Sequence, residues 1–216
     1  MIKVFGAPPT RALRVIWMLE ELGLPYEVHQ VDFPNRLQDK AFIACSPTGA
    51  LPGIEDGDVR MMESVAIVEY LGTRHGPSPL VPPPGDPCWP AFLSWLHFGE
   101  GSLTAPLNVA IGTRFFAPED QKQNWGALFA IDIFVRKSAA LVAPLKRGPW
   151  LLGDTFTAAD ISCGYALGLA RPLALEDRID PVLVDYADRC RERPAYKAAA
   201  AHGQPLPVQA NPQASH

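Results

Sequence analysis

The sequence lacks the basic runs and the long apolar stretches that are typical of nucleic-acid-binding and membrane proteins. It has no long run of Lys or Arg, and 19 basic residues stand against 23 acidic ones, for a formal net charge of -4. Such a surface carries no concentrated positive field for a phosphate backbone, so we expect no nucleic-acid partner. No apolar stretch reaches a membrane span, and residues 1–9 lack the apolar core of a signal peptide. The sequence therefore predicts a soluble, cytoplasmic protein with no membrane partner.

Cysteine is also scarce, and its few positions are widely spaced. The four cysteines are Cys45, Cys88, Cys163 and Cys190. A zinc site, a redox dithiol or a disulfide framework requires closely paired cysteines, which this chain does not have. We therefore expect buried free thiols and no metal site.

The chain does contain enough apolar residues, 48% of 216, to form a substantial core. The opening of the chain has the pattern of a β-α-β unit. The expected elements are a strand over 2–5, a helix from about Thr10 to Leu22 closed by Gly23, and a strand over 26–31. On the helix, the polar residues expected on the solvent side are Arg11, Arg14, Glu20 and Glu21.

The next segment completes a small α/β layer. A helical stretch around 37–44 is followed by a hairpin over 53–62, because Asp56-Gly57 suits the positive backbone dihedrals of a tight turn. A helix over about 64–74 follows. The order β-α-β-α-β-β-α predicts a thioredoxin-like domain with a mixed sheet.

A proline-rich segment then separates two parts of the chain. Residues 76–87, GPSPLVPPPGDP, cannot continue a helix or a central strand, because proline lacks a backbone donor and has a fixed φ. Beyond it the pattern is helical, with kinks expected near Gly99 and Pro106. The predicted fold class is therefore α/β plus all-α. The expected parts are a thioredoxin-like domain over 1–76, a linker over 77–87, a helical domain over 88–202 and a flexible tail over 203–216.

The most informative local feature is the Leu51-Pro52 step just before the hairpin. A cis peptide bond there would turn the Leu51 backbone outward, so that its N–H and C=O can pair with an extended peptide. An ordinary trans proline opening an edge strand is the alternative. The position of this step in the predicted order favours the cis form.

Glu63 and Ser64 come next, at the start of the third predicted helix. A helix N-terminus carries unpaired N–H groups and a partial positive charge, so Ser64 suits a ligand carboxylate while Glu63 suits an ammonium group. A plain N-capping serine with an acidic neighbour is the alternative. Together with the Leu51-Pro52 step, the pair indicates a site for an amino-acid head group.

Three segments of the chain together resemble the glutathione transferases, specifically their bacterial theta- or delta-like branch. The segments are GAPPTRALRVIWMLEELGLPYE, SPTGALPGIEDGDVRMMESVAIVEYL and WLLGDTFTAADISCGYAL. The resemblance implies that glutathione is a co-substrate, that Leu51-Pro52 holds its cysteinyl backbone, and that Glu63 and Ser64 hold its γ-glutamyl end. It also implies a homodimer and a role in detoxification. In the third segment, Thr157 and Asp160 form a variant capping box, so Asp160 is expected to be structural.

Thr10 is the candidate that would activate the thiol. It matches the place where theta- and delta-like relatives have a catalytic serine, and Arg14 matches an arginine further along. A hydroxyl donor and a helix N-terminus both stabilise a thiolate, although the hydroxyl of Thr10 has an alternative role as a helix cap. A second departure from the family is Ala50, where many relatives carry a lysine that reaches the glycyl carboxylate of glutathione.

The resemblance also implies a pocket for a small hydrophobic electrophile. The residues expected to line it are Phe98, Leu103, Phe115 and Phe116. The alternative is that these side chains belong to the core, since an aromatic cluster at helical spacing is more often core than pocket.

Three functions follow for this chain. The leading one is an enzyme that conjugates glutathione thiolate to a small hydrophobic electrophile. The second is a glutathione-dependent disulfide or peroxide reductase, in which glutathione would supply the thiols because the chain has no Cys-x-x-Cys pair. The third is a non-catalytic binding or scaffold protein that keeps the fold. Thr10 and Ala50, which differ from the usual residues of the family, keep this alternative open.

Overall fold

The computed structural model describes residues 1–203, and the later part of the expected tail, from residue 204, lies outside them. The described chain forms two compact units. The first unit contains residues 1–89 together with the segment that begins at Cys190, and the second contains residues 90–189.

The first unit is built on a four-stranded mixed sheet with strand order β2-β1-β3-β4. Its strands are β1 (Ile2–Phe5), β2 (Tyr26–His29), β3 (Gly53–Asp56) and β4 (Val59–Met62). β1 runs parallel to β2 and antiparallel to β3, and β3 pairs antiparallel with β4. The tight turn between β3 and β4 contains Gly57 at φ 61°, which confirms the hairpin predicted from Asp56-Gly57.

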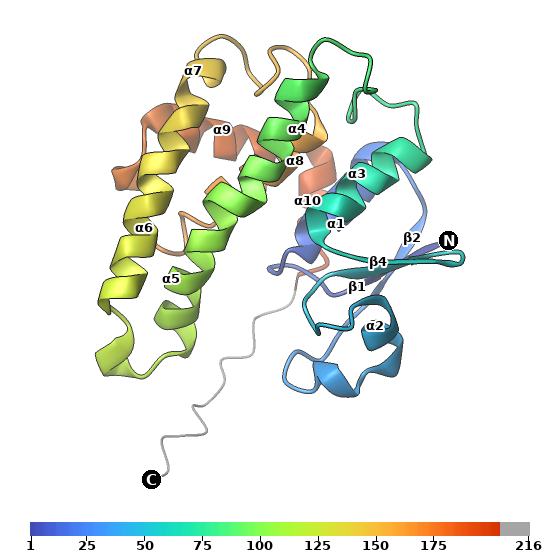
Figure 1. Ribbon diagram of the computed structural model, residues 1–216, viewed down its shortest axis with the longest axis horizontal. Coiled ribbons are helices and arrows are strands. Elements are labelled where there is room, and N and C mark those ends of the chain that lie inside the picture. The colour runs from blue at the N-terminus through green and yellow to red at the C-terminus, as the bar shows by residue number, and fades with distance from the viewer. Residues whose placement is uncertain (204–216) are drawn as a thin grey trace. The chain divides into compact units, whose positions relative to one another are not determined.

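Three helices complete the thioredoxin-like layer, as the sequence predicted. α1 (Ala12–Leu22) and α3 (Ser64–Arg74) cover one face of the sheet, and α2 (Lys40–Cys45) lies on the other (Figure 1). α1 ends at Gly23, whose φ of 64° is left-handed and closes the helix. The fully buried side chains of this unit include Val4, Ile16, Trp17 and Ile54.

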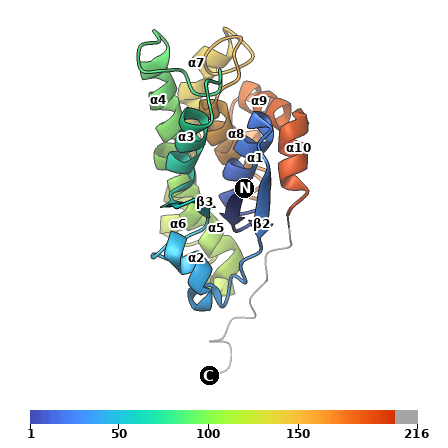
Figure 2. The ribbon, with the colours of Figure 1, turned by 90° about the vertical axis from the view of Figure 1, so that its right-hand side faces the viewer.

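One expectation for α1 is wrong. Arg14 was expected on its solvent side, but its side chain is fully buried. The reason is that α1 is covered on two sides: by α3, and by α10 (Pro194–Ala200), which lies alongside it (Figure 2). Trp17 and Tyr196 pack edge to face at 5.0 Å, and Arg193 donates two hydrogen bonds, of 2.6 and 2.7 Å, to the Glu21 carboxylate.

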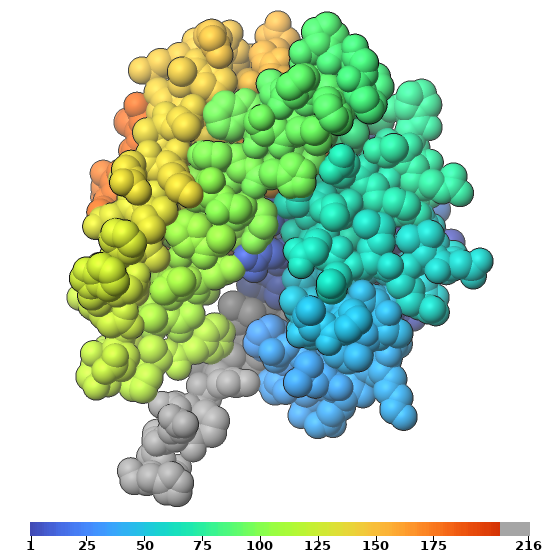
Figure 3. Space-filling view, in the orientation of Figure 1, coloured from blue at the N-terminus to red at the C-terminus, as the bar shows by residue number. Residues whose placement is uncertain are grey.

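The second unit is helical. Its main elements are α4 (Trp89–Phe98), the π-helical segment η2 (Gly99–Thr104), α5 (Ala105–Phe116), α6 (Trp125–Ser138), α7 (Val142–Leu145), α8 (Ala158–Gly168) and α9 (Pro181–Glu192). α5 and α6 pack together, and their ends and connection, in yellow-green, lie on the surface of the unit (Figure 3). Near Gly99, where a kink was expected, the helix becomes π-helical, and a Cβ on Gly99 would lie 2.3 Å from the hydroxyl of Ser162 in α8.

α8 begins at the capping box that the sequence predicted. The Asp160 carboxylate accepts hydrogen bonds from the Thr157 amide at 2.9 Å, from the Leu151 amide at 3.0 Å and from the Tyr186 hydroxyl at 2.9 Å. Asp160 is fully buried, so these donors replace the water it gives up. Its role in the fold is structural.

None of the described helices is long and apolar enough to cross a membrane. The four cysteines form no disulfide, and Cys88 is only partly buried whereas the other three are buried. Among residues 1–203 no group of three or more His, Cys, Asp or Glu side chains is arranged to hold a metal ion.

Candidate functional site

The loop that leads into β3 presents an open piece of main chain. The Leu51-Pro52 peptide bond is cis, as predicted. Pairing of β3 with β1 begins only at Gly53, so Leu51 lies just outside the sheet ladder. Among the described residues, the backbone N–H and C=O of Leu51 have no hydrogen-bond partner. In a sheet, N–H and C=O groups bond to a neighbouring strand. Since those of Leu51 do not, they can pair with an extended peptide.

The loop itself is held by side chains on both sides of Leu51. The Ser46 hydroxyl donates to the Ala50 carbonyl at 2.7 Å, and the Arg36 side chain donates from Nε to the Gly49 carbonyl at 3.0 Å. Gly49 has a φ of 69°, a conformation that glycine adopts without strain. The main chain at Leu51 is thus supported by a loop with fixed geometry.

The start of α3 lies at the same edge of the sheet. Gly53 pairs with Met62 in the β3–β4 ladder, so the residues that follow β4 lie opposite those that precede β3. Glu63 connects β4 to α3 with φ 71° and ψ 101°, an uncommon conformation for a residue with a side chain. The exposed Glu63 side chain and the first amides of α3 thus come close to the open main chain of Leu51.

Ser64, the first residue of α3, is only 3% exposed and makes a buried hydrogen bond. Its hydroxyl oxygen accepts from Nη1 of Arg14 at 3.2 Å. The bond ties the N-terminus of α3 to α1, and it places a guanidinium charge directly behind the helix end. Both the helix dipole and this charge favour an anionic group at the start of α3.

The turn that carries Thr10 packs against the same loop. Gly6 has a φ of 109°, and a Cβ at this position would lie 3.0 Å from the Leu51 side chain. The turn continues through a cis Pro8-Pro9 peptide bond to Thr10. The structure therefore brings Thr10, Leu51 and the first turn of α3 to one end of the sheet in the first unit.

The hydroxyl of Thr10 already has partners in the turn. It donates to the Ala7 carbonyl at 2.7 Å and accepts a hydrogen bond of 3.3 Å from the Ala12 amide. A hydroxyl has one proton to donate, so donation to a ligand sulfur would require this group to rotate away from Ala7. The contact with the Ala12 amide is a local hydrogen bond just ahead of α1, whose N-cap residue is Arg11 and makes no side-chain cap.

The residues expected to line the electrophile pocket differ in their accessibility. Leu103 is fully buried inside the helical unit, and Phe98 is partly buried. Phe115 and Phe116, at the end of α5, are 44% and 42% exposed. Of the four, the last two therefore present the largest apolar surface to solvent.

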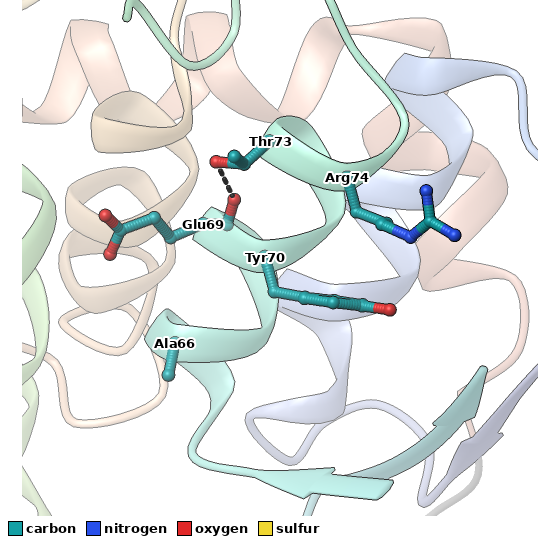
Figure 4. Close-up of a pocket in the computed structure, with 5 residues that line it drawn as sticks. All are labelled: Ala66, Glu69, Tyr70, Thr73 and Arg74. Carbon is teal, nitrogen blue, oxygen red and sulfur yellow. Dashed lines mark hydrogen bonds between the residues drawn. The ribbon is translucent and has the colours of Figure 1, made fainter. Parts of the chain in front are cut away.

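A shallow open hollow lies on the outward face of α3 and does not coincide with these residues. Its lining, drawn in Figure 4, consists of Ala66, Glu69, Tyr70, Thr73 and Arg74. All five belong to one helix, and none is a predicted glutathione-binding residue. The convergence at Leu51 and Ser64 is a better candidate site, since it combines unpaired main-chain groups with a helix N-terminus.

One group of this region has no signal in the sequence: the Arg36 side chain, which donates a hydrogen bond to the Gly49 carbonyl. Arg36 precedes Gly49 by thirteen residues and has no periodic or motif signal around it. Its closeness to the loop depends on the path of the segment between β2 and α2. Only the folded structure reveals it.

Comparison with known proteins adds independent information. Residues 10–79 match the family model of the glutathione S-transferase N-terminal domain. The chain is 30% identical over 200 residues to the glutathione S-transferase-like protein OpS6 of Beauveria bassiana, and the match covers 87% of this chain and 88% of that protein.

Solved structures give the same result for the fold. A glutathione transferase from Methylococcus capsulatus is similar with a TM-score of 0.79 and 27% identity, over 93% of this chain and 98% of that one. A glutathione transferase family member from Pseudomonas fluorescens, solved with two glutathione molecules bound, is similar with a TM-score of 0.83 and 23% identity. That match covers 92% of each chain.

Proposed function

Because this chain belongs to the glutathione S-transferase family, we propose that it conjugates the thiolate of glutathione to a small hydrophobic electrophile. Within the family we place it in the theta- or delta-like branch, on account of Thr10 in the first turn. We also propose that the protein is cytoplasmic, forms a homodimer and acts in detoxification, as the resemblance implies.

The observation that carries the proposal is the geometry around Leu51. Its unpaired N–H and C=O lie beside the N-terminus of α3. Arg14 donates a hydrogen bond to Ser64, the first residue of that helix. In the proposed complex the cysteinyl backbone of glutathione pairs with Leu51. The γ-glutamyl carboxylate then lies at the first amides of α3 and Ser64, and its ammonium group lies near Glu63.

This binding mode would bring the sulfur toward the turn that carries Thr10. In the reaction, the thiolate sulfur forms a bond to the electrophilic carbon, and the leaving group of an aryl halide departs with its electron pair. The chain would contribute by stabilising the thiolate and by holding the two reactants together. Phe115 and Phe116 are the proposed contacts for the electrophile.

The test is retention on glutathione-agarose, followed by turnover with a panel of aryl halides, isothiocyanates and peroxides. We expect retention and conjugation of at least one aryl halide or isothiocyanate. Absence of glutathione binding at millimolar concentration would overturn the proposal. Binding without turnover across the panel would instead support the non-catalytic alternative, with the Thr10 hydroxyl making only its local hydrogen bonds.

A glutathione-dependent reductase is the second candidate, and one comparison favours it. The similar Pseudomonas fluorescens protein was solved with two glutathione molecules bound, which is the stoichiometry that such a reaction needs. One glutathione thiolate would attack a disulfide R–S–S–R′ to form R–S–S–G and release R′S⁻, and the second would attack the glutathione sulfur of R–S–S–G to form oxidised glutathione and release RS⁻. Reduction of a mixed disulfide without any conjugation would select this function.

A further inference from the structure

The segment that follows α10, residues 201–203, lies against β2 in the first unit. The main-chain carbonyl of His202 accepts a hydrogen bond of 3.3 Å from the Gln30 side chain, and its imidazole Nε2 lies 3.0 Å from the Tyr26 hydroxyl. The rings of Tyr26 and His202 are 5.6 Å apart and tilted by 59°. His202 is therefore held by both its main chain and its side chain, beside the strand where α10 ends (Figure 2).

The direction of these hydrogen bonds follows from the phenol of Tyr26. Its hydroxyl donates to the Glu20 carboxylate of α1, and a phenol has one proton, so its oxygen accepts from the Nε2–H of His202. Burial, and then the hydrogen bond to Glu20, raise the pKa of Tyr26, so the phenol stays protonated at neutral pH. The three side chains thus connect the 201–203 segment through β2 to α1.

The same segment covers the turn that carries Thr10. A Cβ built on Gly203 would lie 3.5 Å from the Cβ of Pro8 and 3.7 Å from the Pro8 carbonyl oxygen, so the two residues lie next to each other. Pro8 is buried, whereas Pro9, which follows it, is exposed. The bonds that fix His202 therefore also hold Gly203 against the turn.

The position of this turn decides where the hydroxyl of Thr10 lies. The Leu51 side chain supports the turn at Gly6. The 201–203 segment supports it at Pro8. A displacement of about 1 Å in a reacting group can slow a reaction by about 100-fold, so both supports bear on the geometry of thiol activation.

We propose that His202, held by Tyr26, is a positioning residue for the turn that carries Thr10. It acts on the location of the Thr10 hydroxyl and does not itself contact glutathione. The effect on turnover rests on the proposed function, whereas the effect on the turn does not. None of the His202 contacts named above involves Leu51 or Ser64, so their loss should slow the reaction more than it weakens glutathione binding.

The first measurement is amide hydrogen exchange in the full-length protein without glutathione. In His202→Leu, the amides of Thr10 and Ala12 should exchange roughly ten-fold faster than in the wild type, because the turn loses one of its supports. Tyr26→Phe should have the same effect, and the double variant should add nothing further. His202→Gln should restore wild-type exchange, since the glutamine amide offers an N–H donor at a similar reach.

The second measurement is the kinetics of conjugation by the same proteins. His202→Leu and Tyr26→Phe should lower kcat roughly ten-fold, while KM for glutathione stays within about two-fold of the wild-type value. The pKa of the bound glutathione thiol should move toward about 8.5, the value of a free thiol. His202→Gln should recover both. If the wild type itself shows no turnover, the proposed function fails, and amide exchange alone decides whether His202 positions the turn.

His75→Leu provides the matched control. Nε2 of His75 lies 2.8 Å from the Asp56 carboxylate, so the variant removes a histidine hydrogen bond of the same kind. Asp56 is the last residue of β3, whereas the Thr10 turn follows the end of β1 that pairs with Gly53, the first residue of β3. The control should therefore leave exchange at Thr10, kcat and the thiol pKa unchanged.

Three results would overturn the proposal. The first is unchanged exchange at Thr10 in His202→Leu. The second is faster exchange with kcat and thiol pKa equal to those of an active wild type, because the segment would then contribute to stability alone. The third is additive losses in the double variant, which would show that His202 does not act through Tyr26.

Discussion

Arg14 and Ser64 are fifty residues apart in sequence, and Nη1 of Arg14 donates a hydrogen bond of 3.2 Å to the Ser64 hydroxyl inside the protein. Arg14 is fully buried and Ser64 is 3% exposed. The bond therefore links the middle of α1 to the first residue of α3. It connects the stability of the first unit to the geometry of the candidate site.

Arg14→Met should lower both stability and ligand affinity. We expect the free energy of unfolding to fall by about 1–3 kcal/mol, because the buried Ser64 hydroxyl loses its hydrogen-bond donor. Glutathione affinity should fall as well, since Ser64 loses its anchor and the helix end loses a nearby positive charge. Ser64→Ala should cost less stability, about 1 kcal/mol.

The double variant tests whether these two effects share one cause. Denaturant unfolding and glutathione calorimetry on the four proteins of the cycle give the coupling between Arg14 and Ser64. Arg11→Met, a partly exposed arginine three residues earlier, serves as the control. Additive losses of affinity in the double variant would show that Arg14 does not act through Ser64.

Thr10→Val tests the activation of the thiol, since valine keeps the shape of threonine and removes the hydroxyl. If the hydroxyl rotates from Ala7 to the sulfur, conjugation should slow by about 10–100-fold. The pKa of bound glutathione should return toward about 8.5, the value of a free thiol. Ultraviolet thiolate absorbance against pH measures it.

Thr10→Ser keeps the hydroxyl and serves as the control for that experiment. It should retain both the lowered thiol pKa and the turnover. A thiol pKa in Thr10→Val equal to that of the wild type would assign Thr10 to local hydrogen bonding alone.

Asp160→Asn should destabilise the helical unit without touching the glutathione site. The buried carboxylate accepts bonds from two amides and from the Tyr186 hydroxyl, and an asparagine side chain cannot accept all of them. We expect a loss of about 2–4 kcal/mol in thermal or denaturant unfolding, with unchanged glutathione affinity in the folded protein. Unchanged stability would show that the network contributes nothing to the fold.

Asp39 gives the first unit a dependence on pH. The Phe42 amide and then the His29 ring hold the pKa of the Asp39 carboxyl below its usual value through hydrogen bonds. A depressed pKa stabilises the fold above the unfolded-state value of about 3.9, and that contribution is lost as the pH falls through the lower folded-state value.

Asp39→Asn isolates this charge, because asparagine caps a helix about as well as aspartate does. The variant should be less stable than the wild type by about 0.5–1 kcal/mol near neutral pH and should approach it below pH 4. Urea unfolding at several pH values measures the difference. A gap between the two proteins that stays constant with pH would contradict the assignment.

Much of the first unit could be predicted because its signals are local. Asp56-Gly57 specified the hairpin turn, Gly23 closed α1, and the cis form of Leu51-Pro52 was expected from its place in the order of elements. Each of these signals depends on a few neighbouring residues and on backbone conformations that few residue types adopt.

What could not be predicted depends on packing between distant segments. Arg14 has the helical position of a solvent-facing residue until α3 and α10 cover α1. The contact of Tyr196 with Trp17 joins α10 to α1, which are far apart in the sequence, and no periodicity in either segment specifies it. The clamp of Arg36 on Gly49 is of the same kind.

A crystal structure of this protein soaked with glutathione tests the central claim most directly. The account predicts the cysteinyl N–H and C=O paired with the Leu51 main chain, and the γ-glutamyl carboxylate at the first amides of α3 beside Ser64. Glutathione bound anywhere else, or a site that stays empty at millimolar ligand, would contradict it.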